Sequence, residues 1–185
     1  MFCYQCEQTA KALGCDKLGV CGKSPEQSDL QDVIFYALKN LSIWMLKANE
    51  FEIKDQEVDK HVFEALFSIV TNVNFDNERL YQIILKTYNL KEKIKQEFLK
   101  EYKRKNNKDF SEKISQIAEW QPLPTIEEMI QEAKNFDIRN DSNNEDIRSL
   151  RHLLRFGLEG MAAYAYHAQE LGEIDENVTD FFIRL

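Results

Sequence analysis

The 185-residue sequence lacks features that would place it in a membrane or outside the cell. No apolar run approaches the roughly 18 residues that a membrane-spanning helix needs. Residues 1–6 (MFCYQC) contain no basic stretch followed by an apolar one, so they do not resemble a secretory signal peptide. We therefore expect a cytoplasmic protein that does not bind membranes. Only six glycines and three prolines are present, which favours long helices over β structure with many turns.

Histidine is also scarce, and the 32 acidic residues outnumber the 24 basic ones. The net charge of −8 argues against nucleic acid or an anionic membrane surface as the main partner. His152 and His167 lie on one predicted helix, about 22 Å apart at 1.5 Å per residue, and cannot share a metal ion. His61 has Glu57 and Glu64 within a turn, and we interpret this group as a solvated helix face. No histidine is therefore predicted to be a metal ligand.

Cysteine is confined to the start of the chain. Its four cysteines are Cys3, Cys6, Cys15 and Cys21, with the spacing C-x2-C-x8-C-x5-C. Such a cluster, in a chain without a secretory signal, indicates a metal site before a disulfide framework. The two residues between Cys3 and Cys6 let one turn present both thiolates to one metal centre.

The residues around the cysteines bear on which metal is bound. Structural zinc usually has two short C-x2-4-C pairs, whereas the second pair here is five residues apart. Neighbouring glycines let backbone N–H groups approach inorganic sulfides, and lysines offset the negative charge of a cluster. These residues are Gly14, Gly19 and Gly22, and Lys11, Lys17 and Lys23. The pattern favours an iron–sulfur cluster and leaves zinc, disulfides and inert thiols as alternatives.

The rest of the sequence predicts an all-α fold, with residues 1–27 as a cysteine loop and residues 28–185 as a helical domain. Apolar residues recur at helical spacing, and capping residues mark several helix starts. Ser28 with Gln31 is read as a capping box that opens the first helix. The remaining helices are expected over residues 58–70, 77–104, 110–120, 125–136 and 147–171, and from residue 175, with Asp76 and Thr125 as N-caps and Gly172 after a helix end.

The helix predicted over residues 147–171 has a distinct pattern. Its apolar stripe is expected to face inward and consists of Ile147, Leu150, Leu154, Leu158, Met161, Ala165 and Ala168. Gly157, Gly160, Ala162 and Ala163 make its second half slim, so a neighbouring helix is expected to approach closely there.

Several segments resemble one known family. They are residues 1–9 (MFCYQCEQT), 14–15 (GC), 19–23 (GVCGK), 28–32 (SDLQD), 71–76 (TNVNFD) and 157–165 (GLEGMAAYA). Together they resemble the N-terminal domain of the hybrid-cluster protein (prismane, hydroxylamine reductase) family. The likeness covers nearly the whole chain, apart from a variable region at about residues 100–145. It implies two three-helix bundles set roughly perpendicular to each other.

The resemblance also implies a function. Cys3, Cys6, Cys15 and Cys21 would ligate the family's N-terminal cluster, and their spacing resembles the [4Fe–4S] form; a [2Fe–2S] form goes with longer intervals in other members. That cluster passes electrons from a redox donor protein to a second iron–sulfur–oxygen centre in downstream domains, which reduces hydroxylamine to ammonia.

The sequence departs from the family in one respect. The second centre needs cysteines, a histidine and glutamates from two further domains, and no cysteine follows Cys21 here. We expect no catalytic residue in this chain and no hydroxylamine reduction by it alone. It would be an excised first domain, a truncated gene product, or a half that meets its hybrid-cluster domains in trans rather than in cis. The alternative function is a non-catalytic metal-binding module for assembly or docking.

Overall fold

The computed structural model describes residues 1–173 and 175–184, and this part of the chain is helical. Its α-helices are α1 (Pro25–Asn49), α2 (Gln56–Ser68), α3 (Asn77–Asn106), α4 (Ile126–Ala133), α5 (Glu145–Glu170) and α6 (Glu176–Arg184). Short 3-10 helices cover Ala10–Ala12, Gln116–Glu119, Lys134–Phe136 and Ile138–Asn140. The described residues contain no strand, only an isolated bridge between Cys3 and Cys15. The predicted all-α fold is confirmed.

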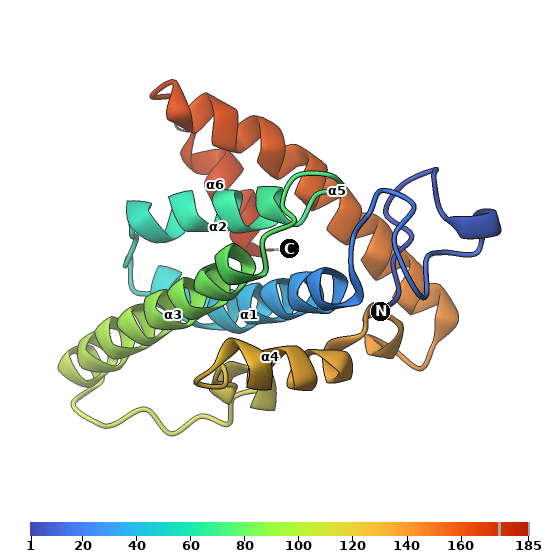
Figure 1. Ribbon diagram of the computed structural model, residues 1–185. Helices are drawn as coiled ribbons and strands as arrows, with labels where there is room; N and C mark the ends of the chain where they lie inside the picture. The colour runs from blue at the N-terminus through green and yellow to red at the C-terminus, as the bar shows by residue number, and fades with distance from the viewer. Residues whose placement is uncertain (174, 185) are drawn as a thin grey trace.

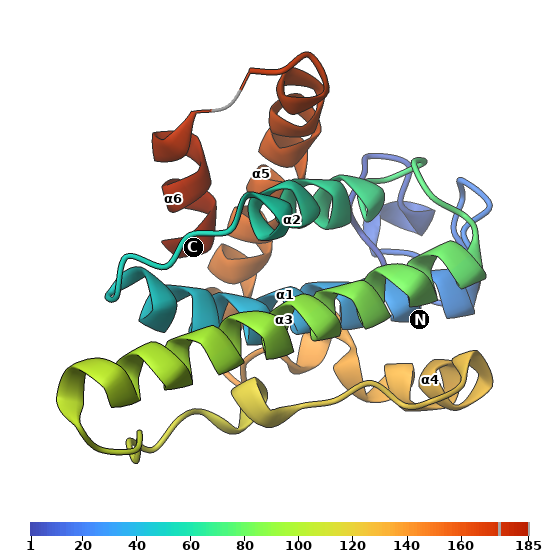
Figure 2. The ribbon, with the colours of Figure 1, turned by 90° about the vertical axis from the view of Figure 1, so that its left-hand side faces the viewer.

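Helix α1 lies at the centre of the molecule. It runs beside α3, with α4 on one side of this pair and α2 on the other (Figures 1 and 2). Helix α5 packs against α2 and passes the cysteine loop at the start of the chain (Figure 1). None of the described helices is long and apolar enough to cross a membrane.

The apolar interior forms two clusters, and α1 contributes to both. Leu30 and Ile34 belong to the cluster that also contains residues of α5, whereas Leu41 and Trp44 belong to the cluster around Phe98 of α3. Helices α2 and α3 also supply side chains to both clusters. These contacts do not establish the predicted division into two perpendicular three-helix bundles.

Helix α1 begins earlier than predicted. Ser24 is its N-cap and forms a capping box with Gln27: the Gln27 N–H donates to Ser24 Oγ at 3.3 Å, and the Ser24 N–H donates to Gln27 Oε1 at 2.8 Å. Pro25 occupies the first helical position, where its missing N–H costs nothing. Ser28 is buried inside the first turn, so its predicted capping role is wrong.

The other predicted helix ends have mixed outcomes. Asp76 caps α3, Thr125 caps α4, and Gly172 follows α5 with a φ of +88°, as predicted. The helix predicted over residues 110–120 is wrong, because only Gln116–Glu119 forms a short 3-10 helix. Two carbonyls of this segment accept hydrogen bonds from α1 side chains instead: Trp120 from Asn40 Nδ2 at 3.1 Å, and Ala118 from Trp44 Nε1 at 3.2 Å.

His61 is the clearest correction to the sequence analysis. It is fully buried rather than solvated, and its Nε2 lies 2.7 Å from Thr87 Oγ1. Thr87 Oγ1 donates to the Ile83 carbonyl at 2.8 Å, so Nε2–H of the histidine is the donor to Thr87. Burial lowers the His61 pKa to about 3, and the positive charges of Lys86 and Arg79 act in the same direction.

Helix α5 is rotated relative to the prediction. Of its expected inward stripe only Leu158 is buried; Ile147, Leu150, Leu154 and Met161 are 47%, 67%, 42% and 45% exposed. The buried face instead carries His152, Arg155, Leu158, Glu159 and Ala162. The reason is that buried polar side chains of α5 meet α1 and the residues before α5, which turns much of the apolar stripe outward.

Candidate functional site

The four cysteines lie on one loop, residues 1–24, at the end of the molecule where α1 begins (Figure 1). Cys3 and Cys15 pair through their backbones: the Cys3 N–H donates to the Cys15 carbonyl at 3.0 Å, and the Cys15 N–H donates to the Cys3 carbonyl at 2.7 Å. Cys21 lies in a turn closed by the Gly19 N–H, which donates to the Lys23 carbonyl at 2.8 Å. Cys15 is buried, the other cysteines are half-buried, and none of the four forms a disulfide.

Two glycines let the loop pack tightly, Gly14 against the Phe2 ring and Gly19 against the sulfur atom of Cys21. Gly14 has a φ of +104°, and a Cβ there would lie 2.7 Å from the ring of Phe2. A Cβ at Gly19 would lie 3.1 Å from Cys21 Sγ and 2.9 Å from the Cβ of Lys23. Only glycine fits these two positions without displacing the neighbouring groups.

The donor set differs from that of a single-ion site. Across residues 1–173 and 175–184, no three His, Cys, Asp or Glu side chains lie close enough together to hold one metal ion. A zinc ion with Zn–S bonds of about 2.3 Å requires its thiolates within about 4 Å of one another. An iron–sulfur cluster takes each thiolate on a different iron, so its ligands stand further apart. The four free thiols on this glycine-containing loop carry the ligand chemistry that an iron–sulfur cluster takes.

Lys23 places a buried positive charge beside the first cysteine. Its side chain is 1% exposed, and Nζ donates to Gln31 Oε1 at 2.6 Å and to Gln5 Oε1 at 3.5 Å. Nζ also lies 3.9 Å from Cys3 Sγ. In the described part of the chain, no carboxylate is among the hydrogen-bond partners of Lys23. Burial raises the pKa of Glu159, and the positive charges of Arg155 and Lys23 oppose that shift, so Lys23 has a carboxyl group nearby although it donates no hydrogen bond to one in the described residues. A thiolate of Cys3 would be a second anion beside this buried ammonium.

The Cys3 thiol itself is in an environment that opposes ionisation. Burial raises the pKa of the Cys3 thiol, while Lys23 and a hydrogen bond from the Gln5 backbone act in the opposite direction. The neighbouring Cys15 also raises this pKa, which is consistent with the two sulfur-bearing residues being close. Lys23 and Gln5 are therefore positioned to stabilise a ligating thiolate.

A buried ion network lies behind the loop and joins α1 to α5. Arg155 Nη1 donates to Asp32 Oδ1 at 2.9 Å, and Arg155 Nε donates to Glu159 Oε1 at 2.7 Å. All three side chains are at most 7% exposed. Burial raises the pKa of Asp32 to about 6 and also raises that of Glu159, and in both cases Arg155 opposes the shift. The network fixes the helices against which the cysteine loop packs.

Aromatic contacts attach the loop to α5. The Tyr4 hydroxyl donates to Nδ1 of His152, whose Nε2–H donates to the Ile138 carbonyl at 2.9 Å. The Tyr4 ring also lies edge-on to Phe156, with a centroid distance of 5.5 Å. Tyr4, next to Cys3, is thereby held at a defined place on the scaffold.

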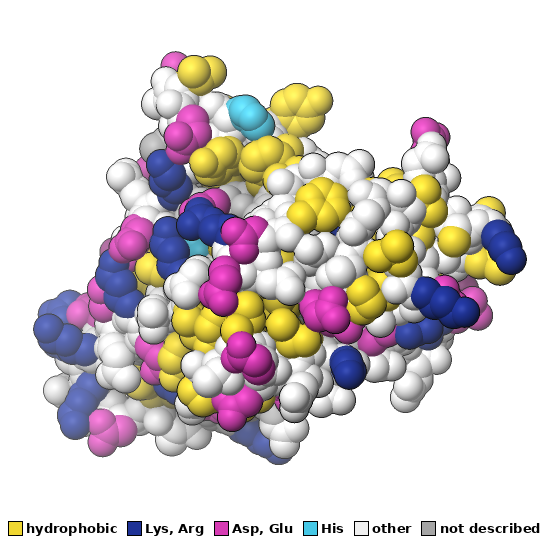
Figure 3. Space-filling model, in the orientation of Figure 1, with side chains coloured by type: hydrophobic (Ala, Val, Ile, Leu, Met, Phe, Trp, Pro, Cys, Tyr) yellow, Lys and Arg dark blue, Asp and Glu magenta, His cyan; other side chains and the backbone are white. Residues whose placement is uncertain are grey.

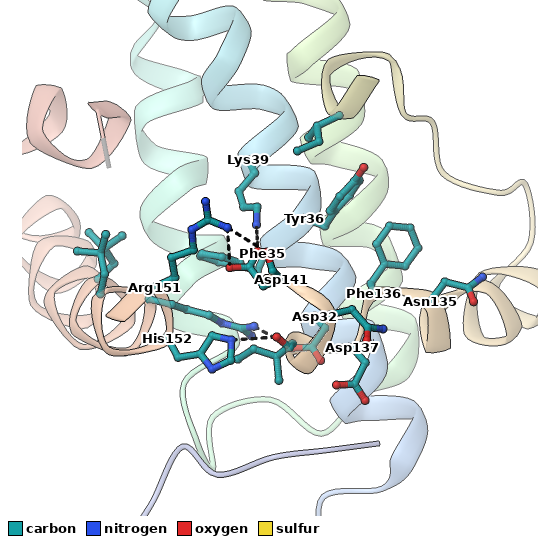
Figure 4. Close-up of a pocket in the computed structure, with 16 residues that line it drawn as sticks. Asp32, Phe35, Tyr36, Lys39, Asn135, Phe136, Asp137, Asp141, Arg151 and His152 are labelled. Atoms are coloured by element: carbon teal, nitrogen blue, oxygen red, sulfur yellow. Dashed lines mark hydrogen bonds and ion pairs between the residues drawn. The ribbon is translucent and has the colours of Figure 1, made fainter. Parts of the chain in front are cut away.

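A cavity of about 520 Å³ lies on the other side of Asp32 (Figure 4). Three of its charged side chains are paired with one another: Lys39 Nζ lies 2.7 Å from Asp141 Oδ1, and Arg151 Nη1 lies 3.6 Å from Asp141 Oδ2. Asp32 also lines a small hollow that contains Cys3 and Lys23, so it separates the cavity from the cysteine loop.

The sequence analysis identified the cysteines but missed the buried charges. It treated Lys23 as one of three equivalent lysines, and it assigned no role to Asp32, Arg155 or Glu159. A usable signal was present, because Asp32 and Glu159 lie in two of the segments that carry the family resemblance. The four cysteines remain a predicted ligand set.

Comparison with known proteins gives a consistent result along the whole chain. A sequence model of the Prismane/CO dehydrogenase family matches residues 1–185. The hydroxylamine reductase of Thermosipho melanesiensis is 42% identical over 182 residues, which cover 98% of this chain and 33% of that protein. The hydroxylamine reductase of Halothermothrix orenii is 40% identical over 181 residues, which cover 98% of this chain and 32% of that protein. The chain thus spans about a third of the length of these curated relatives.

Proposed function

Because this chain belongs to the Prismane/CO dehydrogenase family, we propose that it is the iron–sulfur electron-transfer domain of a hydroxylamine-reductase-type protein. Cys3, Cys6, Cys15 and Cys21 would hold a [4Fe–4S] cluster. When bound, such a cluster supplies reversible one-electron transfer. The observation that supports the proposal is the position of Lys23, a buried cation whose Nζ lies 3.9 Å from Cys3 Sγ at the start of a loop that carries four free cysteines.

The residues of this chain would hold and tune that cluster. Gly14 and Gly19 allow the loop to pack tightly, and Lys23 with Gln31 sets a positive charge beside Cys3. The Asp32–Arg155–Glu159 network keeps the supporting helices fixed. Electrons would come from a redox donor protein in the cytoplasm and pass to hybrid-cluster domains, in cis or in trans, which reduce hydroxylamine.

The test is purification without oxygen, followed by a count of iron and acid-labile sulfide. We expect both in near-equal amounts, and an EPR spectrum that changes reversibly on reduction with dithionite. Replacing any one of the four cysteines with serine should lose or convert the cluster. Zinc without sulfide would contradict the proposal, as would an unchanged spectrum in all four variants.

The alternative function, a non-catalytic metal-binding module for assembly or docking, makes a different prediction. Its metal would show no reversible reduction. The same EPR experiment therefore separates the two functions.

A further inference from the structure

Helix α5 presents a long apolar surface to solvent. We define the α5 face as Leu150, Leu153, Leu154, Gly157, Gly160, Met161 and Tyr164. Leu150, Leu153 and Tyr164 are 67%, 69% and 83% exposed. Between residues 152 and 169 the only charged residues of α5 are Arg155 and Glu159, which are buried, so the exposed surface from Leu153 to Tyr164 carries no charge. An uncharged apolar helix face of this kind is normally covered.

The centre of this face is a groove. Leu150, Leu154, Gly157 and Met161 line it on α5, and Phe181 of α6 lines its other side, around a volume of about 300 Å³. Phe181 is itself 45% exposed. The groove is thus continuous across two helices and has an apolar lining.

Among the described residues, no neighbouring group packs closely against the two glycines of the face. A Cβ at Gly157 or Gly160 would meet nothing within 4 Å. Glycine inside a helix is destabilising relative to alanine. The sequence predicts a close neighbour at these glycines, and the described residues do not provide one. A protein segment other than the described residues, packed against this face, would explain the small side chains.

The position of the face relates it to the cysteine loop. The first half of α5 holds that loop through Tyr4, which contacts His152 and Phe156. The loop also exposes Leu13, Leu18 and Val20, at 78%, 59% and 59%. Figure 3 shows apolar side chains, together with charged side chains of both signs, at this end of the molecule. A body on the α5 face would therefore lie next to the loop from which electrons must leave.

We propose that the α5 face docks the part of a hydroxylamine-reductase-type polypeptide that has no counterpart in this chain. The inference rests on the proposed function and names the surface through which that function is completed. The relatives supply the argument for this occupant: 98% of this chain matches only 33% of the Thermosipho protein, so two thirds of that protein lies outside the match. A second copy of this chain is a poorer occupant because each copy carries a net charge of −8.

Hydroxyl-radical footprinting tests the proposal on proteins as they exist. It would be applied to this chain and to the intact Thermosipho hydroxylamine reductase. We expect Leu150, Met161 and Tyr164 to be modified readily in this chain, and the aligned positions of the intact relative to be modified several-fold more slowly after correction for side-chain type. Leu46 on α1 is 41% exposed and serves as the control, with similar rates in both proteins.

Two results would overturn the proposal. One is equal modification of the aligned positions in the intact relative. The other is a dimer of this chain, seen by light scattering, in which the α5 face is already protected, because a second copy would then be the occupant. Neither result depends on iron or sulfide, so a failure of the docking surface is distinguishable from a failure of the proposed cluster.

Variants test the glycines directly. Gly157→Leu should leave the melting temperature of this chain unchanged or raise it, because the site is open and leucine is a better helix former. In a hybrid in which this chain replaces the matched third of the relative, the same change should restore radical modification of Tyr164 to the rate seen in the chain alone. Leu46→Lys should leave Tyr164 protected. Protection that survives Gly157→Leu would contradict a close approach at this glycine.

Discussion

The ammonium group of Lys23 lies 3.9 Å from the Sγ atom of Cys3, inside a site where Lys23 is 1% exposed. A positive charge at this distance favours the reduced, more negative form of a bound cluster. We expect Lys23→Met to lower the reduction potential by on the order of 100 mV, since unit charges in such sites interact by a few kcal/mol. Potentiometric titration followed by EPR measures the shift.

Lys17→Met is the matched control for Lys23→Met. It removes the same charge from the same loop, but Lys17 is exposed, so water and salt screen its effect. A similar shift in both variants would show that only the net charge of the loop matters.

Arg155 is predicted to be essential for stability. Replacing it with methionine leaves Asp32 and Glu159 buried without their cation. Breaking a buried ion pair in this way costs about 3–5 kcal/mol, so urea denaturation should show a loss of that size. Arg151→Met on the same helix removes an arginine that is 56% exposed and should cost less than about 1 kcal/mol. Equal losses in the two variants would contradict a special role for the buried network.

His61 should make the protein less stable in acid. Its pKa falls from 6.5 to about 3 on folding, so below pH 6.5 the unfolded chain binds a proton that the folded chain refuses. Relative to His61→Gln, the parent protein should lose about 1.6 kcal/mol of unfolding free energy between about pH 6.5 and pH 5. Urea denaturation at several pH values measures this difference.

Two carboxyl groups with raised pKa values affect the pH dependence of stability in the direction opposite to His61, because they stabilise the folded protein as the pH falls. The pKa of Asp32 and that of Asp59 are each raised to about 6, so both groups add stability as the pH falls toward their ordinary values. Both carboxyl groups are present in the parent protein and in His61→Gln, so their contributions to the unfolding free energy cancel in the difference between the two proteins. Identical pH dependence in the two proteins would show that His61 does not titrate as described.

Glycine substitutions should have opposite effects on the loop and on α5. Gly19→Ala places a Cβ 3.1 Å from Cys21 Sγ, and we expect a lower iron and sulfide content. Gly160→Ala places a Cβ in open space within a helix and should raise the unfolding free energy by about 0.5–1 kcal/mol, with iron and sulfide unchanged. Full cluster content in Gly19→Ala would show that the loop can widen around Cys21.

The sequence predicts most of the helices and the cysteine loop, because the signals for both are local. Caps such as Asp76 lie next to the helix that they begin, and all four cysteines fall within one short segment. The start of α1 was misplaced because Ser24 and Ser28 both stand three residues before a glutamine, and only the position of Pro25 distinguishes them.

The buried charges could not be predicted in the same way. Periodicity assigns charged side chains to the solvent, so Arg155 and His61 were expected on exposed faces or given no role. Their burial depends on partners far away in sequence, such as Asp32 for Arg155 and Thr87 for His61. The apolar stripe on α5 could not be placed for a different reason. Periodicity identifies an apolar helix face, but it does not say whether the residues that pack against this face belong to the same chain.

Helix α1 runs through both apolar clusters and begins directly after the cysteine loop. The N-cap Ser24 and Trp44 thus belong to one continuous helix, about 30 Å apart at 1.5 Å per residue. Because one helix joins the two apolar clusters, thermal unfolding should be a single cooperative transition. The fluorescence of Trp44 should then change in the same transition as the cysteine loop unfolds.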